Sequence, residues 1–388
     1  MLAPPPAKVA TSSRRRLIAL LECSGPLTRG QLAALAGLPP TTVAGIVAEL
    51  LRARLVVERP PTTTHGGAGR PARTLEPSGP SRVVGVLGLR DGRLRASVAT
   101  LGGTVLVERS EPLEGGEQTV DVARDPQADL HRLLDRAVAL EPSADLLRTV
   151  LGDAAISEER LAGVVVSVAR PLAGEIDLAP LRDRLAVPVV AENDANLGAL
   201  GEAAFGAGRG LNSFVYLMLG HGVGAGLVFG GRLHRGAAGF AGELGHVQVQ
   251  EEGGLCVCGG RGCLRLLVGP SLLDFAARAT AARLSIPEVL SLAAHHEPGV
   301  RRVFADLGRS VGRPLATLCT MLDPAAVVVD ASLGAAGEPV MSGIREAIDR
   351  HATPVVADSV RVLPGELGER AWVLGGVALA RQMSLDAL

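Results

Sequence analysis

The sequence has no uninterrupted apolar run that approaches the roughly 20 residues of a membrane-spanning helix. Its first residues, MLAPPPAKVATSSRRR, also lack the apolar segment of a secretory signal, and their proline run favours a disordered leader over 1–13. We therefore expect a cytoplasmic protein with no membrane partner. With 388 residues, 47% of them hydrophobic, the chain is long enough for two or three domains.

Lysine is almost absent, because Lys8 is the only one and all other basic residues are arginines. The charges are also unevenly placed. Up to Arg82 there are eleven basic residues against four acidic ones, a surplus of seven, so with an overall net charge of −1 the rest of the chain carries −8. A basic head on an acidic body favours an anionic partner for the head.

The head reads as three short helices. The first runs from Arg14 to the Gly25-Pro26 break, the second opens on a capping box of Thr28 and Gln31 and stops at Gly37, and the third covers about 40–52. The buried stripe of the third helix consists of Val43, Ile46, Val47, Leu50 and Leu51. A tight turn between the second and third helices is typical of a helix-turn-helix.

In that motif the third helix lies in the major groove of DNA, and its N-terminal residues touch base edges. The candidates for base contacts on its unburied side are Thr41, Thr42, Ala44, Gly45 and Ala48. Strands at 55–58 and 73–76 around a glycine-rich tip predict a β-wing. The candidates for backbone or minor-groove contacts are Arg70 and Arg73 on the wing and Arg14, Arg15 and Arg16 at the first helix. We interpret 14–80 as a winged helix-turn-helix and linker; a three-helix module that binds protein is the alternative.

The body reads as α/β. Strands at 83–89, 93–100 and 104–110 precede a helical region at about 128–151, and valine-rich buried strands follow at 161–169 and 187–193. The pattern then repeats, with strands at 214–220 and 223–229, a helical region at about 270–321 and a strand at 326–330. We expect two lobes, 81–205 and 206–388, with a ligand cleft between them.

Five cysteines are too few for a disulfide framework in a chain of this length. Three of them crowd into one glycine-rich segment, which in a cytoplasmic protein favours a metal over a disulfide. The predicted ligands are His246, Cys256, Cys258 and Cys263. One imidazole and three thiolates close a tetrahedral structural Zn²⁺ site, and a reduced thiol cluster beside an unrelated histidine is the alternative.

Three stretches carry a resemblance to a known family: AENDAN (191–196), LGHGVGAGLVFGGRLHRGAAGFAGELGH (219–246) and CVCGGRGC (256–263). Together they resemble the ROK family of bacterial repressors and sugar kinases, and the winged head matches its repressor branch. The resemblance implies a two-lobed, actin-like (ribonuclease H-like) ATPase fold with zinc on the residues named above. It also implies effector contacts at Asn193, Asp194, Glu243 and His246, where Asp194 corresponds to the base of the kinases. By itself, Asp194 is equally well explained as a cap of the following helix.

The sequence departs from the kinase pattern in the first phosphate motif. VGVLGLRDG (84–92) has Leu87 where the kinases have the carboxylate that serves the Mg²⁺-phosphate site. His221 replaces a hydroxyl residue in the second phosphate loop, and only Gly375 and Gly376 remain of the expected adenosine-side glycines. Arg170 also stands where the family usually has glycine. We therefore expect no ATP–Mg²⁺ chemistry, with Asp194 as a vestigial base.

These features lead us to expect a DNA-binding transcriptional repressor. It would read a palindromic operator on double-stranded DNA as a homodimer or dimer of dimers, and a sugar or sugar phosphate would shift its conformation. The first alternative is an ATP-dependent sugar kinase with an appended DNA-binding head. The second is a DNA-binding protein that responds to no ligand.

Overall fold

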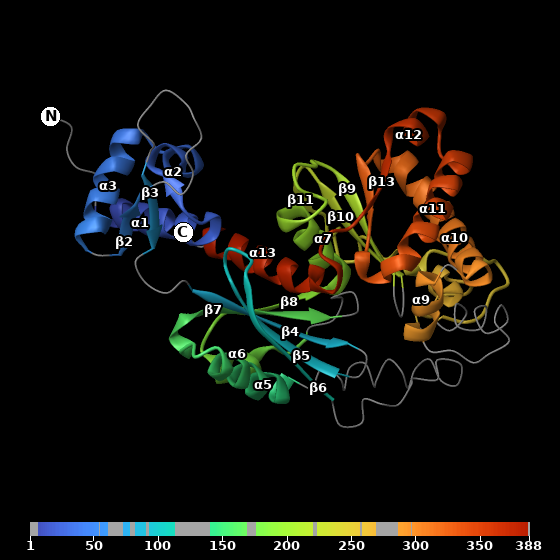
Figure 1. Cartoon of the computed structure of the whole chain (residues 1–388), viewed down its shortest axis with the longest axis horizontal. Coiled ribbons are helices and arrows are strands. Elements are labelled where there is room, and N and C mark those ends of the chain that lie inside the picture. The colour runs from blue at the N-terminus through green and yellow to red at the C-terminus, as the bar shows by residue number, and fades with distance from the viewer. Residues whose placement is uncertain are drawn as a thin grey trace.

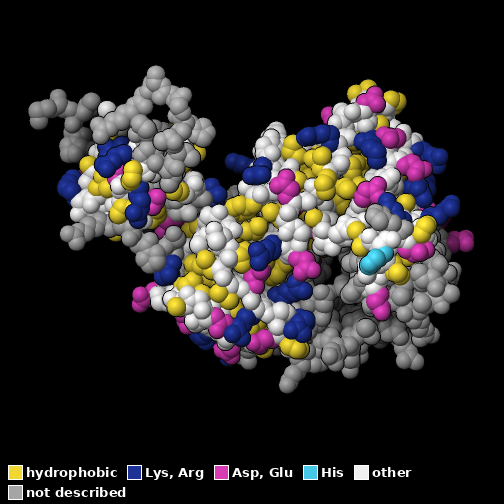
Figure 2. Space-filling model, viewed as in Figure 1, with side chains coloured by type: hydrophobic (Ala, Val, Ile, Leu, Met, Phe, Trp, Pro, Cys, Tyr) yellow, Lys and Arg dark blue, Asp and Glu magenta, His cyan; other side chains and the backbone are white. Residues whose placement is uncertain are grey.

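The computed structural model describes residues 7–53, 55–60, 73–77, 82–90, 93–112, 140–168, 176–219, 223–256, 258–268, 286–295 and 297–386. It consists of a small N-terminal head and two larger lobes, each built on a five-stranded sheet (Figure 1). On the face seen in Figure 2, basic side chains stand out on the head, and basic and acidic side chains are interspersed over the lobes.

The head contains three helices and a three-stranded sheet of order β1-β3-β2. Its elements are α1 (Ala7–Ser24), β1 (Leu27–Thr28), α2 (Arg29–Ala36), α3 (Pro40–Arg52), β2 (Val56–Arg59) and β3 (Thr74–Pro77). The axes of α2 and α3 differ by 114°, within the about 90–120° of a helix-turn-helix. The capping box is present, since Gln31 N donates to Thr28 Oγ1 (3.3 Å) and Thr28 N donates to Gln31 Oε1 (2.9 Å).

The predicted apolar stripe of α3 forms the head's core with Leu17 and Leu32, although Leu51 is only partly buried. The leader expected to be disordered over 1–13 is helical from Ala7 onward, because the proline run ends at Pro6 and no proline or glycine follows it before Gly25. Residues 1–6 lie outside the described residues.

The first lobe has a sheet of order β6-β5-β4-β7-β8, in which β4, β7 and β8 are parallel. Its strands are β4 (Val83–Arg90), β5 (Arg93–Thr100), β6 (Val105–Pro112), β7 (Leu161–Val168) and β8 (Val189–Asn193). The helices α5 (Leu140–Asp153) and α6 (Ala179–Leu185) cover one face, and the turn η2 (Glu158–Arg160) precedes β7. The predicted helical region began at about 128, but residues 113–139 lie outside the described part.

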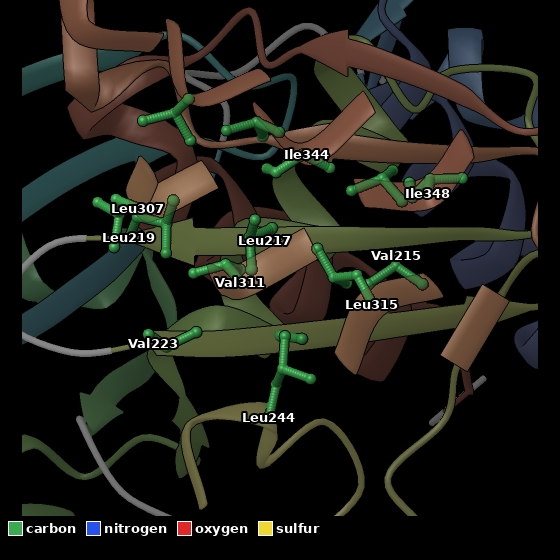
Figure 3. Packing of buried hydrophobic residues seen from close by; sticks show 14 of the residues in the cluster. Val215, Leu217, Leu219, Val223, Leu244, Leu307, Val311, Leu315, Ile344 and Ile348 are labelled. Carbon is green, nitrogen blue, oxygen red and sulfur yellow. The ribbon is translucent and has the colours of Figure 1, made fainter. Parts of the chain in front are cut away.

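The second lobe has a sheet of order β11-β10-β9-β12-β13. Its strands are β9 (Phe214–Leu219), β10 (Val223–Phe229), β11 (Arg232–Leu233), β12 (Ala326–Val329) and β13 (Arg361–Pro364). Its helices and short turns are η3 (Leu244–His246), η4 (Leu264–Leu267), α9 (Ile286–Ala294), α10 (Pro298–Leu322), η5 (Ala331–Ala336), α11 (Gly337–His351), α12 (Pro354–Ser359) and η6 (Gly368–Arg370). Alternate residues of β9 pack against α10 and α11 in the core shown in Figure 3.

Two helices, α7 (Asp194–Phe205) and α13 (Ala371–Asp386), lie between the two sheets. Sequence analysis placed the whole of 206–388 in the second lobe. The structure corrects this, because Trp372 and Val373 of α13 pack against Val84 and Val86 of the first-lobe sheet. The chain thus returns to the first lobe at its end, and α13 continues from there towards α1 of the head.

Within the described residues, no one helix has both the length and the apolar character needed to cross a bilayer. Only α2 and α3 taken together pass that test, and the sharp bend described above separates them.

Candidate functional sites

The third helix of the head presents the residues predicted to read bases. Thr41, Thr42, Gly45 and Ala48 are exposed and Ala44 is half-buried, on the side of α3 opposite its buried stripe. Around Gly45 there is open space, since a Cβ atom added there would meet nothing within 4 Å. The exposed face of α3 is therefore built of small groups that allow the helix backbone to approach a flat or grooved partner.

The predicted phosphate-binding arginines are only partly described. Arg14 and Arg16 are exposed on α1, and Arg73 is exposed at the start of β3. Arg70 and the side chain of Arg15 lie outside the described residues. Sequence analysis missed that Arg14 forms an ion pair with Glu49, and that Arg73 lies 3.5 Å from Glu58. Exposed ion pairs of this kind contribute at most about 1 kcal/mol, so both arginines can exchange a carboxylate for a phosphate at little cost.

Asn193 and Asp194 lie where β8 ends and α7 begins. The side chain of Asn193 is the N-cap, accepting bonds from Ala195 N (2.9 Å) and Asn196 N (3.2 Å). Asp194 is 8% exposed, and its Oδ1 atom accepts a second bond from Ala195 N (2.9 Å). The capping role that sequence analysis weighed for Asp194 therefore belongs mainly to Asn193.

Glu192 directly precedes this pair in β8 and was not among the predicted site residues. Its carboxylate is almost fully buried, and it accepts a hydrogen bond from Arg235 of the second lobe at 2.7 Å. The sequence held one signal of this contact, namely an acidic residue at the end of a valine-rich strand that periodicity predicts to be buried.

Glu243 and His246 form the part of the predicted effector site that the second lobe contributes. Glu243 Oε2 lies 3.8 Å from His246 Nε2. Burial, together with the nearby charge of Asp194, raises the pKa of Glu243, while Arg265 acts in the opposite direction. Burial and Arg265 lower the pKa of His246, which favours its neutral imidazole. Asp194 belongs to the first lobe and Glu243 to the second, so the charge of one lobe acts on a carboxyl group of the other.

The predicted metal ligands meet at one point. His246, Cys256, Cys258 and Cys263 each offer one ligand atom, and these four atoms lie within 4.8 Å of one another. Cys258 Sγ lies 3.6 Å from Cys263 Sγ, and Cys256 Sγ lies 3.5 Å from His246 Nδ1. A tetrahedral zinc ion with bonds of about 2.3 Å to sulfur and 2.0–2.1 Å to nitrogen separates two sulfurs by about 3.8 Å and a sulfur and nitrogen by about 3.6 Å. The cluster therefore fits a tetrahedral metal ion.

The ring of His246 lies between the predicted metal ligands and Glu243. Its Nδ1 atom faces Cys256, while its Nε2 atom faces Glu243. A histidine that binds metal through one nitrogen commonly donates a hydrogen bond from the other to a carboxylate, which fixes the ring. Sequence analysis assigned His246 to both sites, and the two nitrogens of the ring point to one site each.

Three residues of the predicted vestigial phosphate motifs are buried in packed parts of the fold. Leu87 is 1% exposed and packs in the apolar core of the first lobe. Gly375 and Gly376 are buried in α13, where Cβ atoms would lie 1.8 Å from Leu197 O and 2.8 Å from a side-chain carbon of Val86. The packing of α13 accounts for both glycines, and their interpretation as adenosine-side glycines stays a prediction. The substitutions at Arg170 and His221 lie outside the described residues.

Comparison with known proteins places these features in context. A profile described as the ROK family matches residues 148–383. The xylose repressor of Bacillus spizizenii is 26% identical over 366 residues, which are 94% of this chain and 93% of the repressor. A glucokinase of Streptomyces coelicolor is 34% identical over 221 residues, which are 51% of this chain and 69% of the kinase.

The fold agrees with these relatives. The crystal structure of a ROK family transcriptional regulator, described as a homolog of the E. coli MLC protein, superposes with a TM-score of 0.73 at 25% identity and covers 98% of both chains. The head, both lobes and their order along the chain are thus shared with a transcriptional regulator, whereas the glucokinase matches only part of the chain.

Proposed function

The chain belongs to the ROK family, and from that premise we propose that it is a transcriptional repressor whose head binds an operator and whose cleft binds a sugar. The observation that carries this proposal is the head itself: α3 turns its small side chains to the surface next to a β hairpin and exposed arginines. The similarity to a xylose repressor over almost the whole chain supports it. An operator with two half-sites calls for a two-fold symmetric homodimer.

We propose that the lobes do not phosphorylate their ligand. Leu87 lies in the apolar core at the position that the family resemblance matches to the kinases' carboxylate, which leaves no acidic ligand for Mg²⁺ there. The similarity to glucokinases, together with Asp194 at the start of α7, favours a kinase as the second candidate. Both candidates share the fold, so only an assay of turnover separates them.

We infer that the effector is a neutral sugar rather than a sugar phosphate. Asp194 and Glu243 lie near enough for one charge to affect the other, whereas Arg235 already pairs with Glu192. Arg265 lowers the pKa of both Glu243 and His246, so the described charges near Glu243 are one arginine and a second carboxylate, that of Asp194. Carboxylates accept hydrogen bonds from sugar hydroxyls but repel a phosphate.

We propose that the metal is zinc and that its role is structural. Three thiolates and one imidazole complete a tetrahedral shell and leave no position for water or substrate. Bound there, the ion would hold the segment 246–263 in shape and fix the ring of His246 against Glu243. The zinc would thereby support the second-lobe half of the effector site without taking part in any reaction.

Selection of bound duplexes from a random DNA pool at stated salt tests the repressor proposal. We expect enrichment of a palindromic site, with an affinity that falls as salt rises because phosphates are neutralised. The companion assay couples ATP consumption to a panel of sugars. Sugar-dependent turnover that Asp194→Asn abolishes, together with failure to enrich any duplex, would replace the repressor by the kinase.

Thermal unfolding with xylose, glucose and their phosphates tests the effector. A ligand at 100 times its Kd adds about 2.7 kcal/mol to the stability of the folded state. We expect a shift with a neutral sugar and a smaller one, or none, with its phosphate. A larger shift with the phosphate would contradict the charge argument, and no shift with any sugar would favour a DNA-binding protein that responds to none of them.

A further inference from the structure

One ion pair crosses between the lobes directly beside the proposed effector site. Glu192 belongs to β8, the edge strand of the first-lobe sheet, and Arg235 follows β11, the edge strand of the second-lobe sheet. Both Nε and Nη2 of Arg235 lie 2.7 Å from Glu192 Oε2. The contact is unequal in burial, since the side chain of Glu192 is 3% exposed and that of Arg235 is 44% exposed.

The other carboxylate oxygen of Glu192, Oε1, accepts hydrogen bonds from the segment that carries Asn193 and Asp194. Glu192 Oε1 accepts bonds from the backbone N–H of Asn193 (3.0 Å) and from Asn196 Nδ2 (2.9 Å). Asn193 is the N-cap of α7, and Asn196 lies in its first turn. A shift of the Glu192 carboxylate would therefore disturb the start of α7, which carries Asp194.

Arg235 begins the second-lobe segment that leads to Glu243, and backbone hydrogen bonds hold that segment in place. Its carbonyl oxygen accepts a hydrogen bond from Ala241 N (3.0 Å), and the carbonyl oxygen of Gly242, the residue after Ala241, accepts one from Ala225 N (2.9 Å). A Cβ atom at Gly242 would lie 1.9 Å from Ala225 O, so this loop is pressed against β10. Glu243 follows immediately, so the segment that begins at Arg235 delivers the acidic side chain to the cleft.

We propose that Arg235 is a positioning residue for the effector site. Through Glu192 it fixes the separation between Asn193–Asp194 on the first lobe and Glu243–His246 on the second. Loss of the arginine charge leaves a buried carboxylate without its cation, which is costly in a protein interior, so the strand end and the loop separate to admit water. This proposal rests on the proposed function, because it assumes that the cleft binds a sugar.

Hydrogen exchange without any sugar tests the contact itself. We compare Arg235→Gln, which removes the charge, with Arg235→Lys, which keeps it, and with Arg232→Gln, which removes an exposed arginine from the same hairpin. We expect Arg235→Gln to speed amide exchange about tenfold, equivalent to about 1.4 kcal/mol, in both 191–197 and 236–246. Arg235→Lys should show a smaller effect and Arg232→Gln none. Wild-type exchange in both segments of Arg235→Gln would overturn the proposal.

Calorimetric titration with D-xylose and D-glucose tests whether the contact serves the site. We expect Arg235→Gln to weaken the binding of whichever sugar binds the wild type by about 5- to 150-fold, the usual range for coupled sites, with partial recovery in Arg235→Lys. Faster exchange combined with wild-type sugar affinity would overturn the positioning role. If the wild type binds neither sugar, the proposed effector class fails, while the exchange experiment still decides whether Arg235 holds the two segments together.

Discussion

Gly375 of α13 faces the carbonyl oxygen of Leu197 in α7 so closely that a Cβ atom at Gly375 would lie 1.8 Å from that oxygen. A comparable contact occurs at Gly201, where a Cβ atom would lie 2.3 Å from Ala371 O. The two helices between the lobes therefore meet through their backbones. Because α7 also begins at the proposed effector site and α13 also touches the head, this contact links the three parts of the chain.

Gly375→Ala should destabilise the protein, because the added methyl group meets backbone that cannot move aside. Overpacking of this kind costs about 1–3 kcal/mol, which outweighs the gain of up to about 1 kcal/mol from replacing glycine by alanine in a helix. Urea unfolding measures the difference. Gly152→Ala in α5 is the matched control, since its Cβ atom would meet nothing within 4 Å. Equal stability of the two variants would show that α7 and α13 adjust freely.

Gly45→Ala should separate stability from DNA binding. A Cβ atom at Gly45 meets nothing within 4 Å in the free protein, so the variant should gain up to about 1 kcal/mol of helix stability. If α3 lies in the major groove, the same methyl group meets DNA, and the affinity for selected duplexes should fall. Gly152→Ala should leave DNA binding unchanged. Unaltered affinity of Gly45→Ala would remove Gly45 from the DNA-reading surface.

The local features of the chain were predictable from the sequence because each depends on residues that lie close together in the sequence. The capping box of Thr28 and Gln31 and the buried stripe of α3 depend on spacings within a few positions, and the structure confirms them. The four candidate metal ligands were predicted in the same way, since Cys256, Cys258 and Cys263 lie close in sequence and only His246 had to be added.

The long-range contacts were not predictable from such patterns. The apolar character of α13 shows that the helix is buried but not which sheet buries it, so its return to the first lobe was missed. The packing role of Gly375 was missed for the same reason, because its packing partner lies in α7. Glu192 and Arg235 are 43 positions apart and lie on different lobes. No local sequence pattern indicates that a single Glu and a single Arg so far apart form a pair.

Cys258→Ser should lose the metal, because a serine hydroxyl does not replace a thiolate in a soft ligand set. Zinc content of the purified protein measures this, and the second lobe should also unfold more easily because metal binding stabilises the folded state. Cys319→Ala is the control, since Cys319 is buried in the second-lobe core and should affect stability without changing zinc content. Retention of one zinc per chain in Cys258→Ser would exclude this residue as a ligand.

Metal affinity should rise with pH through the neutral range. Burial and the neighbouring thiols raise the pKa of Cys263 to about 12, so the metal-free protein keeps this thiol protonated at neutral pH. Metal must displace the proton, and a lower proton concentration therefore favours binding. Zinc titrations at pH 6, 7 and 8 in two buffers of different ionisation enthalpy would measure proton release. An affinity that is independent of pH would contradict thiolate ligation.

Leu87→Asp should destabilise the first lobe without creating a kinase. Leu87 is 1% exposed in an apolar core, and the loss of such a leucine side chain alone costs about 2–5 kcal/mol. A carboxylate there is also desolvated, which raises its pKa, so the loss should be larger at pH 7 than at pH 4. Leu87→Met, which nearly conserves volume, should cost less than about 1.5 kcal/mol. Urea unfolding at both pH values and a coupled ATP assay test this. Sugar-dependent ATP turnover in Leu87→Asp would instead show that the lobes retain everything for catalysis except this one carboxylate.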